Sequence, residues 1–450
     1  MSRDYTTHMS IKKNKRGLFN AHVKELLHGV SIALFLKILA SSFSFFLHIT
    51  LARLLGAEEY GIFFMAFTII FIVATIGRLG MDNALVRFIA VNIAKEKTDR
   101  IFGGYRKVML LSAVMAISFS MIIYLQAPWI SQFIFRKPKL AYPLSIMALA
   151  VAPLALLTLH AYALQGLKAI ASSILILNLF VPLITCLISL LFVPYFGIDA
   201  AVWGYVVSTF LTLLFGRLLW LKATRSLKKR SVAPESSRFT IFNKYLFGIS
   251  LIDVVMNWSP LLFLGIWESS ANIGIYNAAN RTAMLTNFIL IAVNTTAAPK
   301  FAELYQNRDI KTLNSVVQKT TKLIIYLACP MLFVFLFFPK FVLSFFGESF
   351  TSGASILVIL SIAQLVNMAT GLTGCLLIMS GNEILQFNII CFCISLWIIL
   401  NLILIPNFGI TGGAVASMLL VILINSINMI YVWKRLNIFT FPFCVKYMRN

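Results

Sequence analysis

The stretch "LARLLGAEEYGIFFMAFTIIFIVATIGRLGMDNALVRFIA" (51–90) shows the pattern that repeats along the whole chain. It contains the end of one apolar run, a short polar turn at Glu58 and Glu59, a second apolar run over 61–80 and a charged exit. About 20 mostly apolar residues in a helix span a hydrocarbon core about 30 Å thick. The stretch therefore predicts two membrane-spanning helices joined by a tight turn.

The composition extends this interpretation to the rest of the chain. Of the 450 residues, 60% are apolar and 12% are charged, compared with about 45–50% and about 25% in soluble domains. We therefore expect an all-α membrane protein with about twelve transmembrane helices. The predicted spans are 29–52, 61–80, 108–127, 140–165, 170–194, 199–221, 246–267, 275–299, 322–344, 354–379, 384–405 and 410–433.

The distribution of basic residues predicts the topology. In a soluble protein a net charge of +23 would suggest nucleic-acid binding, but 29 of the 38 lysines and arginines lie in alternate loops and in the two tails. An excess of Lys and Arg on one side marks the cytoplasmic side. We therefore expect both termini in the cytoplasm, a multi-pass protein of the inner membrane, and no nucleic-acid partner.

Four pairs of short segments indicate an internal duplication. "VPYFGIDAA" (193–201) recurs as "IPNFGITGG" (405–413), and "EEYGIFFMA" (58–66) recurs as "ANIGIYNAA" (271–279). With two weaker pairs, the offsets are 212, 213, 215 and 211 residues. Because each half contains an even number of spans, we expect two parallel, pseudo-symmetric six-helix bundles. The expected divisions are a cytoplasmic tail (1–28), an N-terminal bundle (29–221), a basic cytoplasmic linker (222–245), a C-terminal bundle (246–433) and a cytoplasmic tail (434–450).

These motifs resemble those of the polysaccharide-biosynthesis family of flippases. The resemblance rests on "LLGAEEYG" (54–61), "LGMDNALVRFIA" (79–90), "IGIYNAANR" (273–281) and the two "P.FGI" turns, and it covers essentially the whole chain. This family belongs to the superfamily that includes the MATE exporters and the lipid II flippases. The resemblance implies a MATE-like fold with a cationic central cavity.

The resemblance also implies a function. Similar proteins carry an undecaprenyl-pyrophosphate-linked oligosaccharide, an O-antigen, capsule or exopolysaccharide repeat unit, from the cytoplasmic to the periplasmic leaflet by alternating access. The implied partners are this lipid-linked sugar, the lipid bilayer, a polysaccharide polymerase and a chain-length regulator.

Two charged side chains are predicted at matching depths in the first helices of the two halves, Lys37 and Asp253. A charge at the bilayer centre costs about 2.5–3.5 kcal/mol on insertion scales, so each needs a partner or a polar environment. One interpretation makes Lys37 a pyrophosphate contact and Asp253 a coupling site for a cation or proton. The other pairs the two charges structurally.

The eighth predicted span has a polar face that is unusual for a lipid-facing helix. Arg281 lies on it with Asn277 and Asn280, and Asn257 of the seventh span extends it. Arginine suits phosphate recognition because its planar guanidinium donates two parallel hydrogen bonds. We therefore expect this face to line a cavity for sugar or phosphate.

Charged residues also gather at the turns that end the first two spans. Arg78 and Asp82 are four residues apart and share a helix face, with Arg87 one turn further on. They form either a solvated anchor with an internal ion pair or a gate that meets the pyrophosphate first. Arg53 opens the opposite turn beside Glu58 and Glu59, where it forms either a latch or an ordinary surface contact.

The sequence favours transport over catalysis. It contains no Gly-rich phosphate loop, no nucleophile elbow and no Cys or His cluster with zinc spacing, so we expect no enzyme activity, metal or cofactor. A membrane glycosyltransferase or polymerase would need large loops and catalytic acids. The remaining alternative is a MATE-like, cation-coupled exporter of small molecules, which would need acidic residues in its cavity.

Overall fold

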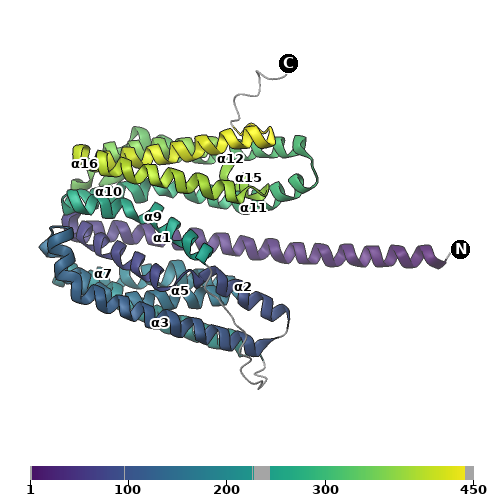
Figure 1. The fold of residues 1–450 in the computed structure, drawn as a ribbon, viewed down its shortest axis with the longest axis horizontal. Coiled ribbons are helices and arrows are strands. Elements are labelled where there is room, and N and C mark those ends of the chain that lie inside the picture. The colour runs from purple at the N-terminus through teal and green to yellow at the C-terminus, as the bar shows by residue number, and fades with distance from the viewer. Residues whose placement is uncertain (1–2, 96, 226, 228–243, 441–450) are drawn as a thin grey trace, which may run out of the picture.

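A computed structural model describes residues 3–95, 97–225, 227 and 244–440, with the backbone alone at 3–34, 244–251, 253–255 and 257. The described residues form helices and no strand. Two lobes lie side by side, with α1 running between them and extending beyond them at its N-terminal end (Figure 1). The predicted N-terminal tail is therefore helical from Arg3 and continuous with the first span.

The first lobe, here called the N-lobe, is formed by the helices up to residue 224. They are α1 (Arg3–Gly77), α2 (Met81–Ala94), α3 (Thr98–Trp129), the π-helix η1 (Ile130–Ile134), the 3₁₀-helix η2 (Pro138–Leu140), α4 (Ala141–Ala148), α5 (Val151–Gly166), α6 (Ile170–Ile174), the π-helix η3 (Leu175–Phe180), α7 (Val181–Phe196) and α8 (Ile198–Thr224).

The second lobe, the C-lobe, follows after the predicted linker, most of which lies outside the described residues. Its helices are α9 (Lys244–Trp267), α10 (Ser270–Ala283), the 3₁₀-helix η4 (Met284–Thr286), α11 (Asn287–Gln306), α12 (Ile310–Phe337), α13 (Pro339–Ser344), the 3₁₀-helix η5 (Glu348–Gly353), α14 (Ala354–Thr370), α15 (Thr373–Met379) and α16 (Glu383–Leu436).

The helices confirm the prediction of an all-α, multi-span membrane protein. In the part of the chain that is described, seven helical segments are long and apolar enough to span a membrane, or eight when the bent α4–α5 pair is included. Two of the seven each contain two arms, because α1 is kinked at Gly56 and α16 at Gly409. The arms correspond to the first two and the last two predicted spans.

Four predicted spans differ from the structure, and one of them, 322–344, is divided where α12 ends at Phe337 and α13 begins at Pro339. The span 140–165 is divided into α4 and α5, which are bent by 47°, and 275–299 is divided at η4. The span predicted at 354–379 ends at Thr370, because Gly371 has a φ of 70° and α15 forms a separate short helix. Each break lies inside a stretch that is apolar enough overall to be predicted as a single span.

The duplication seen in the sequence is also present in the backbone. Gly197, which ends α7, has φ 56° and ψ −142°, and its counterpart Gly409 has φ 58° and ψ −139°. Glycine tolerates positive φ because it has no Cβ. The two "P.FGI" turns therefore reverse the chain with the same geometry.

The two lobes touch through a second pair of repeat-related glycines, Gly61 of α1 and Gly274 of α10. A Cβ on Gly61 would overlap the carbonyl oxygen of Ser270, and one on Gly274 would overlap the carbonyl oxygen of Ala57. The offset of 213 residues that relates Gly61 to Gly274 also relates Ala57 to Ser270. A reciprocal contact of this kind is what a pseudo-two-fold axis between the lobes produces. We call this end of the molecule the glycine end.

This contact generates a stability prediction. Gly61→Ala should lower the free energy of unfolding by roughly 1–3 kcal/mol, because the added methyl group meets the backbone of the opposite lobe, which moves only if the lobes separate. The thermal unfolding midpoint of the detergent-purified chain measures the effect.

The matched control is Gly103→Ala in α3. No atom lies within 4 Å of a Cβ placed at Gly103, so this change should leave stability equal or raise it by about 0.5–1 kcal/mol. Equal midpoints for the two variants would contradict the close lobe contact.

Candidate functional site

A cavity of about 680 Å³ lies between the lobes and is lined mostly by the N-lobe. Helices α1, α5, α7 and α8 form its larger wall, and α9, α10, η4 and α11 close it from the C-lobe side. Arg78, Asp82 and Arg281 are the lysine, arginine, aspartate or glutamate residues among the described lining. The described lining of the cavity is therefore net basic.

Aromatic rings make up much of the cavity wall. Phe63, Phe67 and Phe71 follow one another at four-residue spacing on α1, so they share one face of the helix. Trp258 of α9 packs against this row, with ring centroids 5.3 Å from Phe67 and 4.7 Å from Phe71. A C-lobe ring thus contacts the N-lobe aromatic face across the cavity.

Arg281 lies in the last turn of α10 and lines the cavity. Its guanidinium carbon sits 4.3 Å from the centroid of the Trp258 ring, a favourable cation–π arrangement. Its Nε is buried and has no hydrogen-bond partner among the described residues. Arg281 is thus held against a ring face with donor capacity left over.

A polar network joins the lobes beside Arg281. The amide nitrogen of Asn277 donates to the hydroxyl oxygen of Tyr60 at 3.2 Å, and this hydroxyl lies 2.9 Å from Nδ1 of His48. Because the Asn277 nitrogen can only donate, the proton of Tyr60 is available for His48. His48 and Tyr60 belong to α1 and Asn277 to α10, so the network spans the lobe interface.

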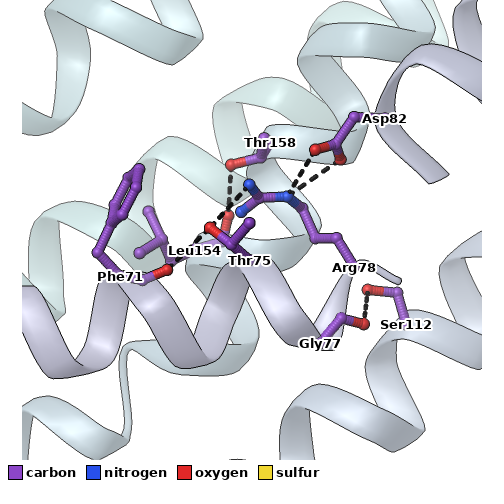
Figure 2. Close-up of polar contacts among 8 residues, drawn as sticks. All are labelled: Phe71, Thr75, Gly77, Arg78, Asp82, Ser112, Leu154 and Thr158. Carbon is purple, nitrogen blue, oxygen red and sulfur yellow. Dashed lines mark hydrogen bonds and ion pairs between the residues drawn. The ribbon is translucent and has the colours of Figure 1, made fainter. Parts of the chain in front are cut away.

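Arg78 and Asp82 form a buried ion pair on the cavity wall (Figure 2). Arg78 Nε lies 3.0 Å and 3.1 Å from the two carboxylate oxygens of Asp82, and Nη2 donates to Thr75 Oγ1 at 3.0 Å. Both side chains are less than 10% exposed. The internal ion pair is therefore present, and it faces the cavity.

Hydrogen bonds between the lobes gather at the glycine end. Arg53 Nε donates to the carbonyl oxygen of Phe345 at 2.7 Å, and Lys137 Nζ donates to that of Gly265 at 2.5 Å. At the same end of the molecule, Glu58 pairs with Lys139 at 2.9 Å. Burial lowers the pKa of Lys137, and the charge of Glu268 opposes this shift.

Comparison with known proteins assigns the family. Residues 26–305, more than half of the chain, match the family model described as "Polysaccharide biosynthesis protein". The chain belongs to this family. Residues 247–403 also match the MatE model.

Curated relatives of this family member include two proteins named for glycan export. The chain is 26% identical over 396 residues to the probable low-salt glycan biosynthesis flippase Agl15 of Haloferax volcanii, covering 86% of this chain and 80% of the relative. It is 27% identical over 291 residues to the succinoglycan biosynthesis transport protein ExoT of Rhizobium meliloti, covering 63% of this chain and 54% of the relative.

Solved structures confirm the MATE-like fold of this family member. A multidrug resistance MATE family transporter in an inward-facing conformation has a TM-score of 0.68 at 14% identity, covering 91% of this chain and 97% of that one. The lipid II flippase MurJ, in an inward closed conformation, also has a TM-score of 0.68 at 14% identity, covering 88% and 86%.

The remaining predicted site residues either do not line the cavity or have side chains outside the described residues. Lys37 is exposed and does not line the cavity. Helical spacing nevertheless puts it on the same face of α1 as Ser41 and Ser44, which line the cavity. Arg87 is exposed on α2, and Asn280 is partly buried, and neither lines the cavity. The side chains of Asp253 and Asn257 lie outside the described residues.

Sequence reasoning missed the aromatic wall, Trp258 and the His48–Tyr60 pair. The four-residue spacing of Phe63, Phe67 and Phe71 was a usable signal, because it puts three rings on one helix face. Nothing in the local sequence signals the contact between His48 and Tyr60, because the two residues meet only where α1 folds back at Gly56. The described residues contain no group of three potential metal-ligating His, Cys, Asp or Glu side chains.

The network beside Arg281 generates a second prediction. Tyr60→Phe removes the hydroxyl that bonds to both His48 and Asn277, leaving two buried polar atoms unpartnered. We expect it to lower the free energy of unfolding by about 1–3 kcal/mol, measured by thermal or denaturant unfolding.

Tyr205→Phe is the matched control, because Tyr205 is also buried and lines the cavity, while its hydroxyl makes no hydrogen bond to the described residues. It should change stability by less than about 0.5 kcal/mol. A Tyr60 variant as stable as the Tyr205 variant would show that the hydrogen-bond network contributes nothing to the free energy of unfolding.

Proposed function

We propose that the protein is a flippase that moves a diphosphate-linked lipid oligosaccharide across the membrane. Family membership and the names of the relatives, two flippases of Haloferax volcanii and a succinoglycan transport protein, support this proposal. The substrate class is an undecaprenyl-pyrophosphate-linked repeat unit of O-antigen, capsule or exopolysaccharide. The protein transports this molecule and does not modify it.

The proposal rests mainly on the surroundings of Arg281. Removing a cation from water is costly unless an opposite charge or hydrogen-bond acceptors replace the lost hydration. Among the described residues Arg281 contacts the face of Trp258, its Nε has no hydrogen-bond partner, and no carboxylate is paired with it. An incoming phosphate supplies the missing anion, and the low local dielectric strengthens the attraction.

The lobe contacts support a transport mechanism by alternating access. The glycine end is held shut by the Gly61–Gly274 contact and by the hydrogen bonds of Arg53 and Lys137. We propose that the opposite end faces the cytoplasm, as the basic loops indicate, with both termini there and the protein in the inner membrane. Rocking the lobes about the glycine contact would then expose the same cavity to the other leaflet. A polymerase and a chain-length regulator would act on the delivered sugar.

A MATE-like exporter of small cations is the second candidate function, because residues 247–403 match the MatE model. Such a cavity would need an acidic side chain available to a cationic substrate. Among the described lining residues the carboxylate is Asp82, and Arg78 neutralises it. The charge of the described lining thus favours an anionic substrate.

The role of Arg281 is testable by substitution. We expect Arg281→Lys to keep more transport than Arg281→Ala, because lysine keeps the charge and loses the planar fork. Arg281→Glu should be worse than alanine, because it adds repulsion against an anionic substrate. The measurement is surface polysaccharide restored to a strain that lacks its own flippase, at equal membrane abundance of each variant.

Arg106→Ala is the control, because Arg106 is exposed on α3 and lies outside the cavity. It should restore polysaccharide normally. Normal restoration by both Arg281→Ala and Arg281→Glu would contradict the proposed function, and so would stronger transport by the glutamate variant.

A further inference from the structure

Arg78 is the second arginine that lines the cavity, and it is held in an ion pair with Asp82. Arg78 directs its Nε at both oxygens of Asp82 and one terminal nitrogen at Thr75, whose own hydroxyl donates to the carbonyl of Phe71 at 2.9 Å. Asp82 thus takes up the nitrogen that a phosphate oxygen would otherwise contact. A ligand can gain the full charge of Arg78 only if the carboxylate of Asp82 moves away from it.

The backbone between the two residues is unusual. Arg78 follows the last residue of α1, and Asp82 lies in the first turn of α2, with Leu79 at φ 52° and Gly80 at φ 65° between them. A leucine at positive φ is strained, and such strain collects at functional sites. Arg78 therefore lies in the turn between the two helices and Asp82 on α2, so no continuous helix fixes the two side chains to each other.

The backbone just before Arg78 is anchored to α3. Ser112 Oγ donates to the carbonyl of Gly77 at 3.1 Å, and a Cβ on Gly77 would lie 3.3 Å from Ala116 (Figure 2). Both anchors belong to α3. Thr158 of α5 also lines the cavity, and its hydroxyl donates to the carbonyl of Leu154 at 2.7 Å (Figure 2).

The cavity charge indicates which ligand would open the pair. With Asp82 bound to Arg78, Arg281 provides the net charge of the described lining. A diphosphate carries an ionised oxygen on each of its two phosphorus atoms, so one free arginine matches half of its charge. Release of Arg78 would provide a second guanidinium, on the N-lobe side of the same cavity.

We infer that Asp82 is a built-in competitor for the substrate, and that the diphosphate displaces its carboxylate from Arg78 when it binds. The inference rests on the proposed function, because it assumes a diphosphate ligand. The exchange at Arg78 makes tight binding depend on an anion strong enough to replace a carboxylate. A singly charged lipid phosphate would compete with Asp82 less well.

The test uses the full-length protein in detergent and farnesyl diphosphate as the probe, with binding followed by the fluorescence of the tryptophans, including Trp258. Asp82→Asn removes the competing charge and keeps an oxygen that can accept from Arg78. We expect it to tighten binding by about five-fold or more, the scale of a coupling between two competing interactions. Arg78→Gln should weaken binding.

Glu303→Gln is the matched control. It removes one negative charge from an exposed pair with Lys300 on α11, away from the cavity, and should leave affinity within about two-fold. Farnesyl monophosphate is the second probe. The ratio of affinities for the diphosphate and the monophosphate should be smaller for Asp82→Asn than for the wild-type protein.

The outcomes separate the two proposals. If folded wild-type protein does not bind farnesyl diphosphate, the proposed function fails. If it binds, and Asp82→Asn binds equally or more weakly, the exchange inference is overturned and the proposed function stands. An Asp82→Asn variant that does not fold also overturns the exchange, because the pair would then be needed closed in the native state.

Discussion

The contact between Gly61 and Gly274 is the constraint on which the rest of the structure depends. Only two residues without side chains allow the backbones of α1 and α10 to approach so closely, and the contact is reciprocal because the halves are repeats. It brings the lobes together at one end, where Arg53 and Lys137 add hydrogen bonds to carbonyl oxygens of the opposite lobe. The space left between the lobes away from this contact is the cavity.

The symmetry of the fold does not extend to the chemistry of the cavity. The N-lobe contributes a row of phenylalanines and a neutralised ion pair, and the C-lobe contributes Trp258 and the cation Arg281. Trp258 contacts both sides, because its ring lies under the guanidinium and against Phe67 and Phe71. A movement of the lobes would therefore change the surroundings of Arg281 directly. This links the binding of an anion to the position of the lobes.

The sequence was sufficient to predict the helical class, most of the spans and the duplication, because hydropathy and glycine-containing turns are local signals. Gly197 and Gly409 share one backbone conformation, as the repeat predicted. Among the charged candidates, Arg281, Arg78 and Asp82 line the cavity, but Lys37 and Arg87 do not. Charge in a span indicates that a polar environment exists, whereas the direction of a side chain depends on how the lobes pack. The same limit applies to Arg53, whose acceptor is the backbone of Phe345, 292 residues away.

The most direct test of this account is transport in liposomes that contain only the purified chain. Two labelled lipids with the same oligosaccharide and the same polyprenyl tail would be compared, one joined through a diphosphate and one through an uncharged linkage. Sugar that reaches the opposite leaflet would be measured with a membrane-impermeant glycosidase. The account predicts that the diphosphate-linked lipid crosses much faster than in protein-free liposomes, and that the uncharged lipid does not. Equal transport of the two lipids would contradict it, because the arginines of the cavity would then have no part in recognising the substrate.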